Sequence, residues 1–253
     1  MSDDPNARLF ADIARYAATR RAGDATRPHA PEATYAEQVE RFRIALTDGG
    51  RPGDEVIREL IALAEPGLAA MTGPRFFGWV IGGSNPVGVA ADWLTSIWGQ
   101  NTANHLASPS ASAAEEACRQ VLLDLFDLPR ESSIGFSTGA TMASFTCLAA
   151  ARGEVLRRAG WDIEAEGVFG APPVTIVLGE EAHSTIFAGL KYLGFGERNI
   201  VRVAVDRNGA MVAGAFAEAM ERVSGPMIAI AQAGHINSGA FDPFGEMARV
   251  VKA

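Results

Sequence analysis

Val174-Thr175-Ile176-Val177-Leu178 is an unbroken run of β-branched and apolar residues. It lacks the alternation of a strand with one solvated face, so it predicts a strand buried on both sides, as in a parallel sheet covered by helices. Further patterns predict a helix over 184–193, a strand over 200–205, a helix over 214–223, a strand over 227–231 and a helix from 243 onward. This βαβαβα order implies parallel strands joined by right-handed crossovers, and we expect a three-layer α/β domain.

The residues before this run are predicted to be mainly helical. Apolar residues at helical spacing indicate helices over 9–17, 35–46, 54–64, 88–99 and 111–127, and an Ala-rich helix that ends at about residue 152. We therefore divide the chain into an N-terminal helical segment, 1–75, and a large domain, 76–253. Short amphipathic helices bury little on one another, so we expect the first segment to cover the main domain or a second subunit.

Composition argues against several classes of function. The chain carries 22 basic and 30 acidic side chains, a net charge of −8, which disfavours binding to the phosphate backbone of nucleic acids. No apolar run approaches the roughly 18 residues that span a bilayer, and the polar N-terminus has no signal-peptide core, so we expect a cytoplasmic protein that does not enter a membrane. Cys118 and Cys147 lack metal-ligand spacing and have apolar neighbours, so we expect buried thiols, no disulfide and no metal site.

Small and polar residues gather at three junctions between an expected strand and the next helix. They are Ser137-Thr138-Gly139-Ala140-Thr141, Glu181-Ala182-His183-Ser184 and Gly234-His235-Ile236-Asn237-Ser238-Gly239. The carboxyl edge of a parallel sheet is where such folds bind ligands. A helix that starts at the first junction would hold a phosphate with its free N–H groups and its positive dipole end. Each junction can also be interpreted as a simple cap or turn.

One junction supports a different chemistry. Gly135-Phe136-Ser137-Thr138-Gly139 fits the G-x-S-x-G nucleophile elbow of α/β-hydrolases, and Asp206 and His235 follow it in the Ser…Asp…His order. No HGGG-type oxyanion segment precedes the serine, and the sequence does not establish that the three residues meet. A serine esterase that uses Ser137 is therefore one alternative.

An ordered set of short matches resembles the pyridoxal-phosphate-dependent group II decarboxylases, which include the aromatic-amino-acid and glutamate decarboxylases. The set is Arg75-Phe76-Phe77-Gly78, Ala107-Ser108-Pro109, Glu115-Glu116, Thr138-Gly139-Ala140-Thr141-Met142-Ala143, Ala149-Ala150-Ala151-Arg152, Ala182-His183-Ser184 and Gly239-Ala240-Phe241-Asp242-Pro243. The resemblance covers roughly residue 35 to the end of the chain. It implies a fold type I large domain like that of PLP-dependent transferases, a homodimer, and decarboxylation of an L-amino acid with pyridoxal 5'-phosphate as cofactor.

The resemblance also implies a phosphate site at the start of the Ala-rich helix. The phosphate loop of the family falls on residues 138–144 of this chain. The N–H groups of Gly139, Ala140 and Thr141 would then cradle the phosphate, together with the Thr141 hydroxyl. Ala140 stands where the family has a second glycine.

Further roles follow from the same resemblance. His183 matches the histidine that stacks on the pyridine ring, and it is the expected catalytic residue. The Gly-Thr-Thr turn of the family is Gly234-His235-Ile236 here, so either His235 or Asn237 would bind the cofactor in place of the missing hydroxyl. The substrate pocket would be lined by Phe77, Trp79, Val80, Asn104 and His105.

Two further family motifs are missing from this sequence. One is a His-Val-Asp-Ala strand whose aspartate protonates the pyridine nitrogen, and the other is the lysine that forms the Schiff base. Only two of the 22 basic residues are lysines, Lys191 and Lys252, and neither has the family's neighbours. We therefore expect a sheet that is incomplete at the C-terminus and a truncated or split chain, inactive alone, that binds the cofactor weakly or not at all. A non-catalytic fragment of this fold is the remaining alternative.

Overall fold

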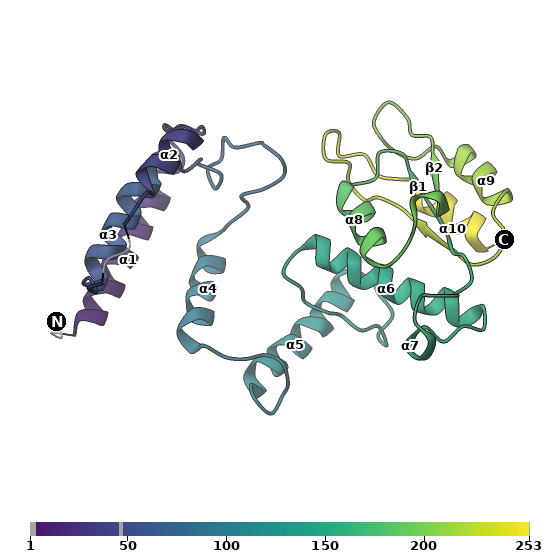
Figure 1. Cartoon of the computed structure of the whole chain (residues 1–253), viewed down its shortest axis with the longest axis horizontal. Helices are drawn as coiled ribbons and strands as arrows, with labels where there is room; N and C mark the ends of the chain where they lie inside the picture. The colour runs from purple at the N-terminus through teal and green to yellow at the C-terminus, as the bar shows by residue number, and fades with distance from the viewer. Residues whose placement is uncertain (1–3, 46–47, 253) are drawn as a thin grey trace. The chain divides into compact units, whose positions relative to one another are not determined.

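The computed structural model describes residues 4–45 and 48–252, without the side chain of Lys252. The chain forms two compact units, Met1–Gly99 and Gln100–Ala253 (Figure 1). This division lies at residue 99, whereas the sequence patterns divide the chain at residue 75. The functional boundary at residue 75 stays a prediction.

The second unit contains the predicted alternation of strands and helices. Its strands are β1 (Thr175–Gly179), β2 (Ile200–Val203) and β3 (Met227–Ile230), and its helices are α5 (Pro109–Leu125), α6 (Ala140–Arg158), α7 (Ile163–Glu166), α8 (Ser184–Tyr192), α9 (Ala213–Glu221) and α10 (Phe244–Lys252), with a 3-10 turn η2 (Glu197–Asn199). The strands pair in parallel in the order β2-β1-β3, with Val177 of β1 opposite Val201 and Ala229. The predicted parallel α/β architecture is confirmed.

The central strand β1 is buried on both faces. Ile176 and Leu178 point to one face and pack with buried residues of α6 and α8. Val177 points to the other face and packs with Phe216 of α9 and Met247 of α10. Side chains that are fully buried in this way each contribute about 1.5–3 kcal/mol of hydrophobic free energy. The result is the expected sequence of layers, helix, sheet and helix, within the second unit.

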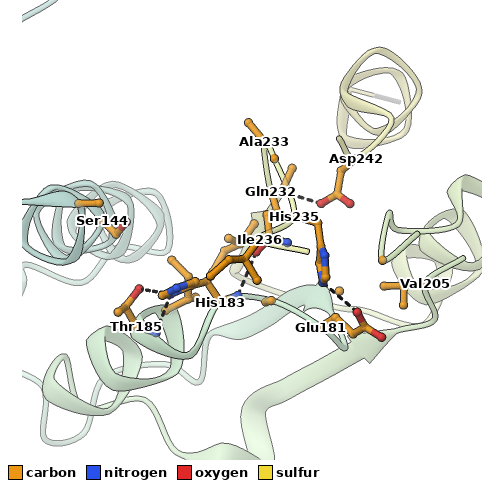
Figure 2. Close-up of a pocket in the computed structure, with 18 of the residues that line it drawn as sticks. Ser144, Glu181, His183, Thr185, Val205, Gln232, Ala233, His235, Ile236 and Asp242 are labelled. Carbon is orange, nitrogen blue, oxygen red and sulfur yellow. Dashed lines mark hydrogen bonds and ion pairs between the residues drawn. The ribbon is translucent and has the colours of Figure 1, made fainter. Parts of the chain in front are cut away.

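Parallel pairing places the loops that follow the strands at one edge of the sheet. The loop after β1 and the loop after β3 lie side by side there (Figure 2), and the His183 backbone N–H donates to the Gln232 side chain across them at 3.0 Å. Glycines with positive φ allow sharp turns in this region, as at Gly209 (φ +81°) and Gly234 (φ +93°). The polar junctions of the sequence therefore gather at this edge.

The first unit is helical, and residues that favour helix ends mark the start or the end of several of its helices. They are α1 (Pro5–Ala22), α2 (Tyr35–Arg41), α3 (Gly53–Ala64), the 3-10 turn η1 (Glu65–Gly67) and α4 (Pro86–Trp98). Thr34 and Glu37 form a reciprocal capping box at α2, and α4 runs from an Asn85 cap to left-handed Gly99. The helix predicted over 35–46 is confirmed only in part: α2 ends at Arg41, and residues 46 and 47 lie outside the described ranges.

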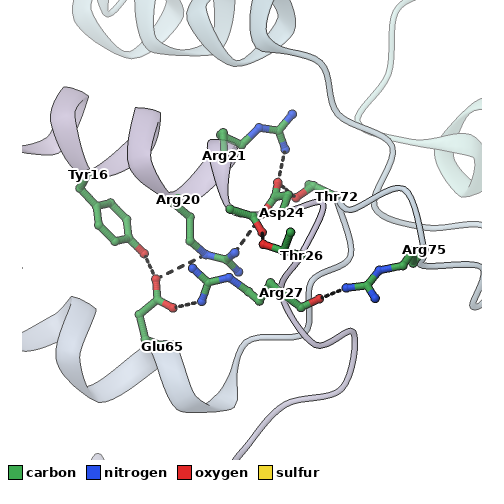
Figure 3. Close-up of polar contacts among 10 residues, drawn as sticks. Tyr16, Arg20, Arg21, Asp24, Thr26, Arg27, Glu65, Thr72 and Arg75 are labelled. Carbon is green, nitrogen blue, oxygen red and sulfur yellow. Dashed lines mark hydrogen bonds and ion pairs between the residues drawn. The ribbon is translucent and has the colours of Figure 1, made fainter.

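Polar contacts, rather than a buried apolar core, connect the parts of the first unit (Figure 3). Glu65 accepts a hydrogen bond from the Tyr16 hydroxyl and pairs with Arg27 at 2.7 Å and with Arg20 at 3.4 Å. Asp24, which is buried, pairs with Arg20 at 3.0 Å. Burial and the Glu65 carboxylate raise the pKa of Tyr16, whereas the hydrogen bond from Tyr16 and the two arginines lower the pKa of Glu65.

Large apolar side chains of the first unit are left exposed. None of the described residues in α1 to α4 is buried. The exposed ones include Phe10, Tyr35, Val56, Leu60, Val87 and Ile97. That these helices cover another surface stays a prediction. Within the described residues, no helix is both long enough and apolar enough to cross a membrane.

The prediction of two buried thiols is wrong. Cys118 and Cys147 are both free and both exposed. The buried residues of α6 are Leu148 and Leu156, and the buried residue of α5 is Leu123. Apolar neighbours in sequence therefore do not bury a residue when its helix face has no cover. In the part of the chain that the structure describes, no three His, Cys, Asp or Glu side chains are grouped as metal ligands.

The pH dependence of the first unit tests the contacts of Glu65. Glu65→Gln is expected to destabilise this unit by about 1 kcal/mol at neutral pH, because charge-assisted bonds from Tyr16 and Arg27 are weakened. The folded-state pKa of Glu65 is lowered, so its stabilisation is present above the unfolded value of about 4.3 and is lost as pH falls through the folded value. Urea unfolding at neutral and acidic pH measures both effects.

The matched control is Glu59→Gln. This change removes the charge from an exposed pair with Arg51 and should alter unfolding little. Equal destabilisation by the two substitutions at neutral pH would contradict a special role for Glu65.

Candidate functional site

A cavity of about 360 Å³ lies at the carboxyl edge of the sheet (Figure 2). It is lined from α6 by Ala140, Thr141 and Ser144, from the loop after β1 and the start of α8 by Glu181, Ala182, His183, Thr185 and Ile186, from the loop after β2 by Val205 and Gly209, and from β3 and the loop after it by Ile230 to Ile236 and by Asp242. All of these residues belong to the second unit. Apart from α6, the lining comes mainly from the segments that follow the three strands, which suits a ligand site in an α/β fold.

The N-terminus of α6 opens toward this cavity without a side-chain cap. Gly139 is the N-cap residue and makes no capping hydrogen bond. The intrahelical ladder begins where the Ala143 N–H donates to the Gly139 carbonyl at 3.1 Å. The N–H groups of Ala140 and Thr141 precede that bond, at the positive end of a 19-residue helix. This end of α6 can therefore donate hydrogen bonds to an anion.

His183 is fixed by the helix that it starts. Its Nδ1 accepts from the Thr185 backbone N–H at 3.3 Å and lies 2.9 Å from the Thr185 hydroxyl, so the ring caps α8. An Nδ1 that accepts a backbone hydrogen bond assigns the proton of the neutral ring to Nε2. The His183 N–H is held in turn by Gln232. The ring lines the cavity while its Nδ1 is occupied by the cap.

His235 and Glu181 are in hydrogen-bond contact on the cavity wall. The distance from His235 Nε2 to Glu181 Oε2 is 2.9 Å, with His235 only 11% exposed and Glu181 52% exposed. His235 Nδ1 accepts from the Asn237 backbone N–H at 3.3 Å. Both ring nitrogens of His235 therefore have protein partners.

Asp242 and Gln232 are residues that the sequence reasoning missed as parts of this site. The buried Asp242 accepts from the Met211 N–H at 2.7 Å and from the Gln232 N–H at 2.6 Å. The side-chain oxygen of Gln232 accepts a hydrogen bond from the His183 backbone N–H, so the position of His183 is linked through Gln232 to Asp242. A polar residue directly after an apolar strand, and an aspartate just before the proline of a predicted helix, were the signals available.

The structure brings together some of the predicted site residues. Ala140, Thr141, His183 and His235 line the cavity, Gly139 directly precedes Ala140, and Asn237 is not among the lining residues. Phe77, Trp79 and Val80 belong to the first unit, where they are exposed, and Trp79 and Val80 have left-handed φ angles of 51° and 52°. Asn104 and His105 are exposed and do not line the cavity; the Asn104 oxygen accepts the N–H groups of Leu106 and Ala107. Their roles in binding stay predictions.

The geometry does not support the serine-esterase alternative. The Ser137 hydroxyl donates to the Gly139 carbonyl at 3.1 Å. Asp206 accepts from the N–H groups of Asn208 and Ala210 in its own turn, and His235 pairs with Glu181. Among the described residues, no hydrogen bond links Ser137, Asp206 and His235 into a relay.

The charges around the cavity define what it can bind. Its lining includes the carboxylates Glu181 and Asp242 and the imidazoles His183 and His235, but no lysine or arginine among the described residues. Lys191 is exposed on α8 and is not part of the lining. An anionic group here would therefore rely on the N–H groups of α6 and on the His183 ring. The arrangement suits a ligand with an anionic end placed at the start of α6.

Comparisons with known proteins agree with this arrangement. The family model described as the pyridoxal-dependent decarboxylase conserved domain matches residues 37–253. L-2,4-diaminobutyrate decarboxylase of Rhizobium meliloti is 31% identical over 169 residues, which cover 65% of this chain and 32% of the relative. Mouse CSAD superposes with a TM-score of 0.86 at 22% identity, over 98% of this chain and 54% of that one. Oryza sativa TDC, crystallised with PLP and tryptamine, gives a TM-score of 0.85 at 22% identity, over 100% of this chain and 53% of that one.

The chain thus spans about half the length of these solved structures and about a third of the curated relative. The solved structures share the fold, and the family model covers residues 37 to 253. The resemblance found in the sequence is confirmed: this chain belongs to the family of pyridoxal-dependent decarboxylases.

Proposed function

We propose that the protein represented by this chain is a pyridoxal-phosphate-dependent L-amino-acid decarboxylase, a carboxy-lyase, and that the cavity at the carboxyl edge is its cofactor site. The observation that carries the proposal is the uncapped N-terminus of α6 beside the fixed imidazole of His183 on one cavity. The N–H groups of Ala140 and Thr141 would hold the phosphate, and the His183 ring would lie against the pyridine. The residues present therefore fit this cofactor at its phosphate and ring.

The bound cofactor supplies an electron-withdrawing ring that accepts the negative charge left at the substrate Cα when CO2 departs. The protein residues supply orientation. The Asp242 carboxylate binds the Gln232 N–H, and the Gln232 side chain binds the His183 backbone N–H, so the His183 backbone is tied to the segment between β3 and α10. Such supporting bonds keep a stacking residue within the small displacements that catalysis tolerates.

The proposal includes further elements that the family suggests. The substrate is an amino acid, for which Phe77, Trp79, Val80, Asn104 and His105 are the proposed pocket residues. The relative from Rhizobium meliloti is named for L-2,4-diaminobutyrate, so diamino acids are the first substrates to test. The exposed free thiols Cys118 and Cys147 suit a reducing, cytoplasmic compartment.

We further propose that the 253 residues alone bind the cofactor weakly and do not decarboxylate. Support comes from Lys191, which does not line the cavity. Borohydride reduction in the presence of pyridoxal phosphate, followed by peptide mass spectrometry, tests this. A stoichiometric adduct on Lys191 that depends on His183 would contradict the proposal.

Substitution of His183 separates stacking from capping. His183→Asn keeps a side-chain oxygen that can cap α8 but removes the ring, so we expect unchanged thermal stability and about tenfold weaker binding of pyridoxal phosphate. His183→Ala removes both, and should in addition destabilise the protein by about 1 kcal/mol. Absorbance titration and thermal unfolding measure the two effects. Wild-type affinity in His183→Asn would contradict a stacking role.

Substitution of Thr141 tests the phosphate end of the site. Thr141→Val removes the hydroxyl of a residue that lines the cavity, and we expect several-fold weaker binding of pyridoxal phosphate with little change for pyridoxal, which lacks the phosphate. Thr146→Val is the matched control, because Thr146 lies on the same helix and its hydroxyl bonds only to the Met142 carbonyl. Equal effects of the two substitutions, or equal loss for both ligands, would argue against the phosphate site.

The family also suggests a homodimer, in which the first unit covers a partner. The exposed apolar side chains of α1, α3 and α4, such as Phe10, Leu60 and Ile97, support this proposal. We expect light scattering to give the mass of a dimer, and Leu60→Glu with Ile97→Glu to shift the protein toward monomers. Glu59→Lys, a charge change on the same helix as Leu60, serves as the control. A monodisperse wild-type monomer would contradict the dimer.

A further inference from the structure

Three loops at the carboxyl edge converge on the His235 side chain. Loop 1 (residues 180–183) follows β1, loop 2 (204–212) follows β2 and loop 3 (231–243) follows β3. His235 of loop 3 pairs through Nε2 with Glu181 of loop 1 at 2.9 Å, as Figure 2 shows. The His235 side chain is only 11% exposed, whereas Glu181, at 52%, reaches it from the solvent side of the wall.

Gly209 brings the backbone of loop 2 against the same pair. A Cβ at this position would lie 2.6 Å from His235 Cδ2, 2.8 Å from His235 Nε2 and 3.0 Å from Glu181 Oε2. The first two distances are shorter than any normal carbon contact, and φ of Gly209 is +81°. A side chain here would therefore force the His235 ring to move and would strain the backbone, and glycine avoids both. Loop 2 can reach the pair only because glycine occupies this position.

Other bonds hold loops 2 and 3 in the same register. The Ser238 hydroxyl donates to the Asn208 carbonyl at 2.5 Å, and the Met211 N–H donates to Asp242 at 2.7 Å. Loop 1 is connected to loop 2 as well, because the Val205 N–H donates to Glu180 at 3.3 Å. His235 is the side chain at which contacts from all three loops meet.

We propose that Glu181, His235 and Gly209 form a three-loop lock, in which His235 is a positioning residue for the cofactor cavity. Both ring nitrogens of His235 are engaged, by Glu181 and by the Asn237 N–H, so the ring acts on a ligand through the shape of the wall and not through a hydrogen bond of its own. The lock keeps the wall formed by loops 1 and 3 in place opposite α6. The ligand part of this inference rests on the proposed function, whereas the lock itself is a property of the ligand-free chain.

The first experiment compares Gly209→Ala with Gly225→Ala. Both glycines have left-handed φ, +81° and +85°, but a Cβ at Gly225 meets nothing within 4 Å, so the control reproduces the backbone strain without the clash. Hydrogen–deuterium exchange of the ligand-free chain should show faster exchange in loops 2 and 3 for Gly209→Ala only. Titration with pyridoxal phosphate should show about tenfold weaker binding for Gly209→Ala and a change within about twofold for Gly225→Ala.

The second experiment uses His235 and does not depend on the folding of the Gly209 variant. His235→Ala should open the loops and weaken binding of pyridoxal phosphate by about tenfold, while His235→Gln, whose amide can donate to Glu181, should restore most of both. Rescue by glutamine distinguishes positioning from general loss of stability, which thermal unfolding monitors in parallel.

The outcomes separate the lock from the proposed function. If the wild-type chain does not bind pyridoxal phosphate, the proposed cofactor site and the positioning role of His235 are both contradicted. The hydrogen–deuterium exchange measurements then still test whether the three loops are held together. Unchanged exchange in Gly209→Ala and His235→Ala overturns the lock. Faster exchange with undiminished affinity overturns the positioning role, and both effects together with rescue by His235→Gln support the whole proposal.

Discussion

Burial of β1 on both faces is the constraint on which the second unit depends. Ile176 and Leu178 are covered by α6 and α8, and Val177 is covered by α9 and α10. A strand without a solvated face needs helices on both sides, and connections through helices make its neighbours parallel. In a parallel sheet, the loops that follow the strands all lie at the same edge, and the cavity lies at that edge. The position of the site is thus a consequence of how the apolar residues of one strand are covered.

Hydrogen bonds between the loops at this edge hold the loops in fixed positions. Asp242 fixes the loop after β3 to the loop after β2, Gln232 passes the restraint to His183, and the Glu181–His235 pair closes the contact between loops. The two bonds to Asp242 are buried or partly buried, where a missing partner is costly. The uncapped start of α6 is the complementary feature, because its N–H groups are left for a ligand.

The two units differ in how they are held together. The second unit has buried clusters around the sheet, whereas the first relies on carboxylates such as Glu65 and Asp24 with their arginine partners. Most of its large apolar side chains are exposed, as are those of the aromatic loop with Phe77, Trp79 and Val80. A segment of this kind gains stability by covering another surface, which is the physical basis for the proposed dimer.

The sequence by itself determined the elements and their order. Periodicity of apolar residues located the three strands and the helices between them, because side-chain spacing reflects which faces are buried. The resemblance placed His183, Ala140 and Thr141 at one site, and they line one cavity. It did not place Asp242 and Gln232, whose role depends on partners 10 to 49 residues away along the chain. Nor did it reveal that Cys118 and Cys147 are exposed, because exposure depends on which helix faces are covered.

The tertiary structure alone decided how the loops interlock. In the sequence, Glu181, Gly209 and His235 are separate residues of three segments, and His235 also fits the alternative of a catalytic relay with Asp206. In the fold, the contact with Glu181 and the absence of a side chain at Gly209 fix its place. Contacts between loops far apart in the chain follow from backbone paths that local patterns do not encode, so they emerge only when the strands have been brought together.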